Sequence, residues 1–322
     1  MRYAFVAVLV AFASAMSAMA SAKLLTHYEK FRAVEGLFDA SGALQLPDGR
    51  IMIVQDTRSA PIVLLRSDEE LLVAEPWTRE TIATRSGGVI EGLSDLEEGA
   101  LSDGFVYALA SQGKPGADSF ARFRIKDDRM TEASVFTGLK GAIRARHPAL
   151  ERAATAGSDP GFNLEGFTFD RNGARALLGF RAPSLDGKAA VVALDNPAEL
   201  FKPGAVPRIG SLTLLDLDGD GIRGMAWLAK INGYLIAGRR EKESAAGGKR
   251  PFRLWFWTGD AKTKPRAVAI EGLRSMGRLE GIAHVVINGE ERILLVSDEG
   301  DREYGTPSEV ALIAYERLRI AP

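Results

Sequence analysis

Five short segments of the chain place a polar residue beside a glycine, and three of these polar residues are Glu165, Arg223 and Glu280. A carboxylate can act as a general base or bind a cation, and a guanidinium can hold a phosphate or a carboxylate. We therefore treat these segments as candidate site elements. They are Ala40-Ser41-Gly42-Ala43, Glu97-Glu98-Gly99-Ala100, Leu164-Glu165-Gly166-Phe167, Ile222-Arg223-Gly224-Met225 and Leu279-Glu280-Gly281-Ile282.

The second segment departs from the pattern, because Glu97 stands where the others have an apolar residue or alanine. We interpret Leu96 as the apolar residue and Glu98 as the equivalent of Glu165. On this interpretation the segment contains a one-residue insertion or a β-bulge.

The segments recur at regular intervals, which indicates a repeated structural unit. From Ser41 the polar residues follow at 57, 67, 58 and 57 residues. After each segment comes an Asx-Gly pair, which tolerates the positive φ of a tight hairpin turn, and then a nearly continuous apolar run. Such runs are typical of strands covered on both faces. The runs are residues 51–54, 105–110, 176–180, 234–237 and 293–296.

This repeat predicts an all-β fold, a β-propeller with four-stranded antiparallel blades. Five blades are favoured, and six blades or a β-sandwich are the alternatives. The fifth unit lacks its last strand, and residues 24–34 could supply it and close the ring. We expect residues 23–322 to form a single propeller domain.

Propeller geometry brings the start of each innermost strand and the end of the next strand to one face. On this face we expect Glu165 and Glu280 as candidate catalytic residues. The candidate ligand-binding residues are Glu98, Arg181, Arg223, Arg239 and Asp298. Crowded carboxylates raise one another's pKa or recruit a cation, so a divalent cation such as Ca²⁺ is an expected cofactor. The alternative is a network in which the arginines pair the carboxylates and only stabilise the ring.

A second candidate metal site is the segment Asp216-Leu217-Asp218-Gly219-Asp220-Gly221, with Asp216, Asp218 and Asp220 as ligands. It opens like a calcium-binding loop, but its twelfth position is Trp227 instead of the bidentate Glu of an EF-hand. An Asp-rich turn is the favoured interpretation.

Composition narrows the possible partners. The formal net charge is −1, so no overall field attracts nucleic acid. There is no cysteine, which excludes disulfides, thiolate metal sites and a cysteine nucleophile. We expect the partner to be a small molecule or a protein ligand at the charged face.

Residues 1–22 have the features of a signal peptide: Arg2, an apolar stretch over 5–15, and small residues around Ala20 and Ala22. Cleavage there predicts a periplasmic or secreted protein with no further membrane attachment. The alternative is an uncleaved membrane anchor, because the apolar stretch approaches a spanning length.

The chain resembles the domain of unknown function 3616 family of bacterial proteins. Its most specific matches are Gly179-Phe180-Arg181-Ala182-Pro183 and Gly221-Ile222-Arg223, and the likeness extends over nearly all of residues 23–322. The resemblance implies a propeller-like fold and no established activity. The Glu-Gly repeat is also distantly similar to phytase-like esterase propellers, by analogy only.

Two function classes remain open. In the first, the charged pocket belongs to a hydrolase of phosphorylated or ester substrates that binds an anionic small molecule, a divalent cation or both. In the second, the protein is a non-catalytic binding or interaction scaffold of the cell envelope.

Overall fold

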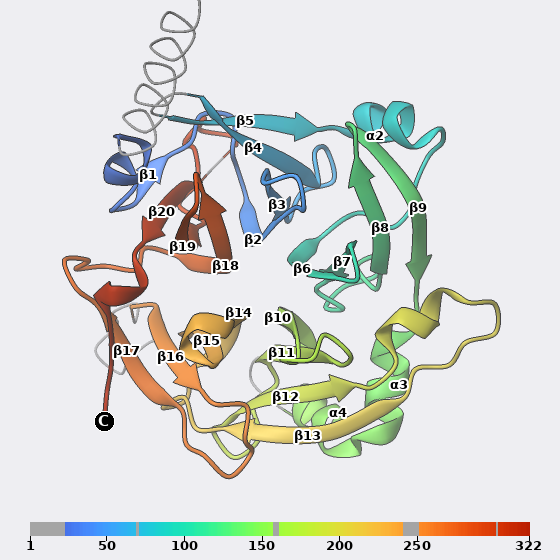
Figure 1. Cartoon of the computed structure of the whole chain (residues 1–322). Coiled ribbons are helices and arrows are strands. Elements are labelled where there is room, and N and C mark those ends of the chain that lie inside the picture. Colours follow the sequence, from blue (N-terminus) through green and yellow to red (C-terminus); the bar gives the residue numbers. More distant parts are fainter. Residues whose placement is uncertain (1–22, 69–70, 157–160, 241–250, 301) are drawn as a thin grey trace, which may run out of the picture.

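The computed structural model describes residues 23–68, 71–156, 161–240, 251–300 and 302–322. They form a ring of five antiparallel sheets, a five-bladed β-propeller (Figure 1). The prediction of a five-bladed propeller is confirmed. Residues 1–22, to which the sequence assigns a signal peptide, lie outside the described residues.

In each blade the first strand lies nearest the axis, and these first strands contact one another around the ring. Blade 1 contains β2 (Ala40–Gln45), β3 (Ile51–Gln55), β4 (Ile62–Asp68) and β5 (Leu71–Trp77). Blade 2 contains β6 (Leu96–Ser102), β7 (Phe105–Ala110), β8 (Phe120–Lys126) and β9 (Arg129–Phe136). Blade 3 contains β10 (Asn163–Phe169), β11 (Ala176–Ala182), β12 (Ala189–Leu194) and β13 (Ile209–Leu215).

The last two blades contain the first and the last strand of the described chain. Blade 5 contains β18 (Leu279–Ile287), β19 (Glu290–Ser297), β20 (Glu309–Ile313) and β1 (Arg32–Ala33). Because β1 pairs with β20, the N-terminal segment closes the ring as predicted. Blade 4 contains β14 (Gly221–Leu228), β15 (Gly233–Arg239), β16 (Arg253–Trp257), β17 (Arg266–Ile270) and β21 (Leu318–Ile320). The prediction of four strands per blade missed β21, whose three residues are too few to show a strand pattern.

The hydrophobic core consists of five clusters, each between two neighbouring blades. Alternate residues of a second strand therefore enter different clusters. In β3, Ile51 and Ile53 pack against blade 5, whereas Met52 and Val54 pack against blade 2. This two-sided burial explains the continuous apolar runs in the sequence.

The Asx-Gly pairs form the turns between first and second strands, as predicted. In blade 2 both turn residues have positive φ, 50° at Asp103 and 71° at Gly104, and blade 5 has the same arrangement at Asn288 and Gly289. Two consecutive positive φ values define the type I′ turn, whose twist matches that of a hairpin.

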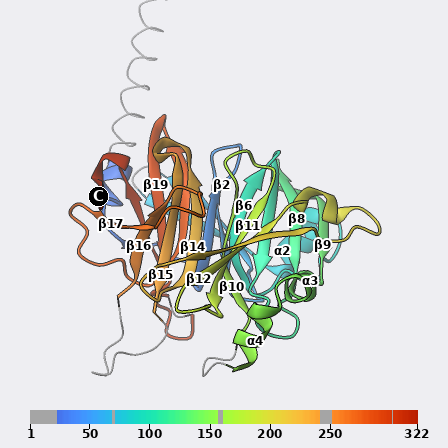
Figure 2. The same ribbon diagram turned by 90° about the horizontal axis from the view of Figure 1, so that it is seen from below.

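The α-helices lie in the connections between blades; they are α2 (Arg79–Ser86), α3 (Leu139–Arg146) and α4 (Pro148–Ala156). Of the 3₁₀ turns, η1 (Pro197–Phe201) lies within blade 3, η2 (Ala229–Ile231) lies within blade 4, and η3 (Tyr315–Arg317) joins β20 to β21. Figure 2 shows α4 projecting beyond the strands on one side of the ring. Within the described residues, no helix is long and apolar enough to cross a membrane.

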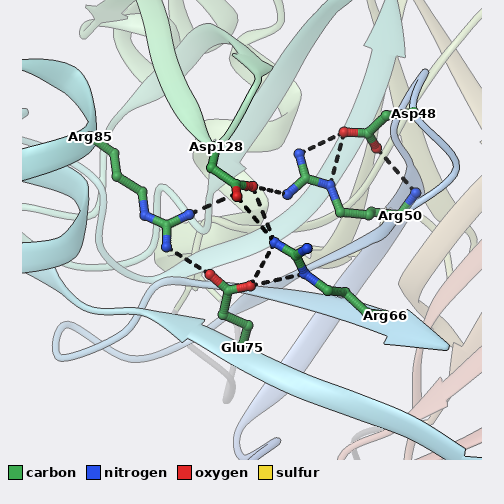
Figure 3. A network of polar contacts seen from close by, with 6 residues as sticks. All are labelled: Asp48, Arg50, Arg66, Glu75, Arg85 and Asp128. Carbon is green, nitrogen blue, oxygen red and sulfur yellow. Dashed lines mark hydrogen bonds and ion pairs between the residues drawn. The ribbon is translucent and has the colours of Figure 1, made fainter. Parts of the chain in front are cut away.

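A polar network on the surface joins blades 1 and 2 and helix α2 (Figure 3). We call it the inter-blade network; it contains Asp48, Arg50, Arg66, Glu75, Arg85 and Asp128. Asp128 of blade 2 is its centre, because it contacts Arg50 and lies 3.1 Å from Arg66 and 3.8 Å from Arg85. Three arginines thus face three carboxylates, and the network has no net charge.

Candidate functional site

Each innermost strand has a β-bulge near its start. In β10 the register steps from Leu164 to Gly166, so that Glu165 has no partner in β11. A bulge re-aims the side chain of its extra residue. The five bulged residues all lie at one level around the axis; they are Ser41, Glu97, Glu165, Arg223 and Glu280.

Blade 2 differs from the interpretation of its sequence. Leu96 pairs with Ala110 and Glu98 pairs with Leu109, so the bulged residue is Glu97. There is no insertion: Glu98 instead replaces the glycine that follows the bulge in the other blades. The structure therefore places Glu97 at the mouth of the channel and Glu98 one residue deeper.

The bulged residues line a pocket of about 470 Å³ at one mouth of the central channel. We call it the top pocket. Among the described residues, its lining contains seven carboxyl groups and four cationic side chains, a formal excess of three negative charges. The carboxyl groups belong to Asp39, Asp56, Asp95, Glu97, Glu165, Glu280 and Asp298, and the cations to Lys114, Arg181, Arg223 and Arg278.

One half of the top pocket is an ion-pair network, which we call the paired half. Arg223 places Nη1 2.8 Å from Glu165 and Nη2 2.7 Å from Glu280. Glu165 also receives the guanidinium of Arg181 at 2.7 Å and the side-chain amide of Asn163 at 3.1 Å. The structure thus brings together both candidate catalytic glutamates, and their carboxylates are held by arginines.

The other half, which we call the acidic half, comes from blades 1 and 2. Carboxylate oxygens of Asp56, Asp95 and Glu97 lie within 4.8 Å of one another, the spacing of a possible cation site. Asp95 also accepts a hydrogen bond from Ser111 and pairs with Lys114, whose side chain is 61% exposed. One largely exposed lysine thus faces three carboxyl groups.

Protons are shared within the acidic half. Burial, the hydrogen bond to Asp95 and the charge of Asp95 raise the pKa of Asp56 to about 7. Burial would also raise the pKa of Asp95, but hydrogen bonds from Asp56, Lys114 and Ser111 outweigh it and lower this pKa. Burial and the charge of Glu165 raise the pKa of Glu97 well above its usual value. Asp56 is therefore partly protonated at neutral pH.

The pKa values of two further carboxyl groups of the pocket are also raised. Burial raises the pKa of Glu280 to about 8, although Arg223 opposes this shift. Burial likewise raises the pKa of Asp298 to about 6, opposed by Arg278, which lies 3.5 Å away. Groups that titrate near neutral pH are suited to acid–base catalysis.

Three of the predicted residues lie in this pocket with the two glutamates, namely Arg181, Arg223 and Asp298. Arg239 does not line it: its guanidinium lies over the ring of Phe252, 5.0 Å from the centroid.

The Asp-rich segment forms a turn between β13 and β14, and none of its residues lines the top pocket. Arg253 pairs with Asp218 at 2.7 Å and with Asp220 at 2.6 Å. Asp216 is exposed and accepts the backbone N–H of Asp218. Two of the three candidate ligands are thus neutralised by an arginine.

Several pocket residues were missed by the sequence interpretation, notably Asp39, Asp95, Lys114 and Arg278. A signal for three of them exists, because the polar repeat extends one residue further toward the N-terminus. Asp39, Asp95, Asn163 and Arg278 all directly precede the apolar residue of their segments, and all line the pocket. Asp39 and Asp95 have positive φ, 49° and 56°, a conformation that Asp tolerates better than most residues.

Comparisons with known proteins were made with the sequence and the structure. No family model and no curated protein sequence matches. Among solved structures, the PQQ-bound aldose sugar dehydrogenase of Streptomyces coelicolor is 15% identical, with a TM-score of 0.44 over 90% of this chain and 98% of that chain. The glutaminyl cyclase of Myxococcus xanthus is 12% identical, with a TM-score of 0.47 over 91% and 96%.

A GH43_1 enzyme of Xanthomonas citri, solved with xylose, is also similar. It is 11% identical, with a TM-score of 0.44 over 94% of this chain and 96% of that chain. We draw no functional conclusion from similarities at this level, and the function has to be argued from the pocket itself.

Proposed function

We propose that the top pocket binds a divalent cation such as Ca²⁺ and that the protein hydrolyses phosphate-ester or ester substrates that reach this pocket. The observation that carries the proposal is the excess of carboxyl groups, seven against four cations, with three of them gathered in the acidic half. Hard cations prefer clustered oxygen ligands, and a cation would relieve the repulsion that raises these pKa values.

The charge of the pocket favours a cation over a free anionic ligand as the first occupant. Arg223 and Arg181 already pair with Glu165, and Arg278 lies beside Asp298. An anionic substrate would therefore approach a negative surface unless a cation is bound. We expect the cation and the arginines together to bind the negatively charged group of the substrate, because each of them can bind an oxyanion.

One side chain of the pocket fits the role of a general acid. Glu280, with a pKa of about 8, holds a proton at neutral pH and can donate it to a leaving group. Asp56, Asp95 and Glu97 would hold the cation, which would supply the activated water. Glu165 would then anchor Arg181 and Arg223 instead of acting on the substrate.

The test combines binding and turnover. We expect Ca²⁺, Mg²⁺ or Mn²⁺ to bind in calorimetric titrations and to raise the melting temperature, because a ligand that binds only the folded state stabilises it. We also expect hydrolysis of p-nitrophenyl phosphate, bis-p-nitrophenyl phosphate or p-nitrophenyl acetate. Asp95→Asn should abolish both effects. The matched control is Asp128→Asn, which removes a carboxylate of the inter-blade network and should leave both intact.

The second candidate is a non-catalytic binding protein, and the paired half favours it. Arg223 holds both Glu165 and Glu280, so these residues have a sufficient structural role. Cation binding without turnover of any ester would support this alternative. If no divalent cation binds or raises the melting temperature, the proposed cation site is contradicted, both for a hydrolase and for a non-catalytic binding protein.

We also propose that the protein is exported, on the pattern of residues 1–22. The N-terminal sequence of protein recovered from the cell envelope should begin at Ser21 or Lys23. An intact N-terminus in the membrane fraction would contradict this. Membership of the domain of unknown function 3616 family is part of the same proposal.

A further inference from the structure

Two cavities lie on the propeller axis, and one residue level separates them. The top pocket contains the bulged residues of all five innermost strands. A lower cavity of about 370 Å³ contains residues two positions further along the same strands. These are Ala43, Gly99, Phe167, Met225 and Ile282, and no described residue lines both cavities. The intermediate level therefore decides whether the channel is open.

Four of the five residues at the intermediate level are glycines, and the fifth is Glu98. The glycines are Gly42, Gly166, Gly224 and Gly281. The glycines let neighbouring innermost strands approach closely, since a Cβ atom on Gly224 would lie 1.9 Å from the carbonyl oxygen of Glu280. Glu98 therefore supplies the one side chain at this level. A Cβ atom on Gly42 would lie 2.2 Å from Oε1 of Glu98, and one on Gly224 would lie 3.5 Å from Oε2.

The carboxyl group of Glu98 thus lies between blades 1 and 4, although its backbone belongs to blade 2. Its Oε1 accepts the backbone N–H of Ala43 at 3.1 Å and that of Gly99 at 3.0 Å. The backbone N–H of Met225 also faces this group. Only 1% of Glu98 is exposed, so little water reaches it from either mouth.

We propose that Glu98 is a plug that closes the central channel and makes the top pocket blind-ended. A ligand of the top pocket must then enter and leave by the same mouth, and it must fit a cavity of about 470 Å³. Glu98 is on this view a specificity-determining residue, since it sets the depth of the pocket. The inference holds whatever the top pocket binds.

The geometry also explains why a carboxyl group suits this place better than an apolar side chain. Ala43, Gly99 and Met225 present backbone N–H groups to the axis at or just below this level. Buried N–H groups without an acceptor are costly, and one carboxyl group can serve several of them. Glu98 therefore fills the channel and satisfies the donors that line it.

The test compares Glu98→Gly with Glu98→Gln in the absence of divalent cations. Glycine restores the residue of the other four blades, so the crystal structure should show the two cavities joined. Glutamine keeps the volume and an acceptor oxygen, so it should keep them separate. Two cavities that stay separate in Glu98→Gly would overturn the proposal, because another group would then be the barrier.

Amide hydrogen exchange supplies a second readout that a loss of stability alone would not move. In Glu98→Gly we expect the N–H groups of Ala43 and Gly99 to exchange roughly tenfold faster or more, relative to the amides of β4. Equal acceleration of all amides would contradict the plug. In the wild type these two amides should exchange as slowly as those of β4. Rapid exchange of them there would overturn the proposal even if the glycine variant failed to fold.

Discussion

The top pocket and the inter-blade network are built from the same types of charged side chain, but they differ in their balance of charge. The inter-blade network sets three arginines against three carboxylates on a partly exposed surface. The top pocket gathers seven carboxyl groups against four cations at the mouth of the channel. Both regions link blades, so contact between blades does not require the excess charge of the pocket.

The pKa values express this difference. Burial would raise the pKa of Asp48, but the hydrogen bonds and charge of Arg50 outweigh it and lower the pKa. Hydrogen bonding to Arg50 is the main reason that the pKa of Asp128 is lowered as well. In the top pocket the pKa values of Asp56 and Glu280 rise instead. Balanced charges stabilise the fold, whereas the unbalanced pocket holds a strain that a ligand can relieve.

The largest expected effect comes from removing the arginine at the centre of the paired half. Arg223→Ala removes an ion-pair partner of the buried Glu165 carboxylate and the hydrogen-bond donor to Glu280, and should lower the free energy of unfolding by about 3–5 kcal/mol. Arg66→Ala, at a half-exposed network residue, should cost about 1 kcal/mol or less. Urea unfolding measures both.

The control for this pair is Arg239→Ala, because Arg239 lies over Phe252 outside the pocket. It should resemble Arg66→Ala. Equal losses for Arg223→Ala and Arg66→Ala would remove the distinction between the two regions.

The next effect is a pH dependence of opposite sign in the two regions. The folded-state pKa values of Asp56, Glu280 and Asp298 are raised to about 7, 8 and 6, so the folded protein binds protons that the unfolded chain has released. Their stabilisation is complete below pH 4 and is lost as pH rises toward 8. The slope is up to about 1.4 kcal/mol per pH unit for each proton bound only in the folded state, and it is smaller for Asp56, whose 47% exposed side chain is screened by solvent.

The network carboxylates behave in the opposite way. The pKa of Asp128 is lowered, so its contribution is present above its unfolded pKa and is lost as pH falls through its folded pKa. When the free energy of unfolding is measured from pH 3 to 9, it should fall at low pH, which we call the lower limb, and again at high pH, which we call the upper limb. Glu280→Gln should flatten only the upper limb, and Asp128→Asn only the lower one. An upper limb unchanged in Glu280→Gln would show that this carboxyl group is not a source of the strain.

A smaller effect is expected for Asp128→Asn at neutral pH. Asp128 is 48% exposed at its side chain and contacts three arginines, so we expect a loss of about 1 kcal/mol. Exposed ion pairs are screened by salt, and the loss should shrink at high ionic strength. The measurement is urea unfolding at low and high sodium chloride concentration. A salt-independent loss would indicate that packing, and not charge, explains the cost.

The sequence predicts the ring well because its signals are local and repeated. Asp103-Gly104 and Asn288-Gly289 specify their turns through their own backbone preferences, and the apolar run over 51–54 reports burial on both faces. These features need no knowledge of distant residues. Strand β21 is not predicted from the sequence, because its place beside β17 depends on a contact between distant parts of the chain.

The site is less predictable because one residue of register decides which way a side chain points. Glu97 and Glu98 are adjacent and chemically identical, yet one lines the top pocket and the other fills the channel. Leu96 settles the register through its pairing with Ala110, a partner that the repeat does not identify. The pairing of Arg253 with Asp218 likewise depends on β16, which comes long after the Asp-rich turn in the sequence.

The smallest expected effect is at Asp216, and it tests directly whether the balance of charge determines where a cation binds. The Asp-rich turn has the sequence of a calcium loop, but Asp218 pairs with Arg240 and Arg253, and Asp220 pairs with Arg253. If balance between charges decides where a cation binds, this turn should behave like the inter-blade network. Asp216→Asn should then change the free energy of unfolding by less than about 0.5 kcal/mol, because Asp216 is an exposed residue. It should also leave the rise of melting temperature with Ca²⁺ at its wild-type value, whereas Asp95→Asn abolishes it. Loss of the Ca²⁺ effect in Asp216→Asn would place the cation in the turn, and the excess of carboxyl groups in the top pocket would need another explanation.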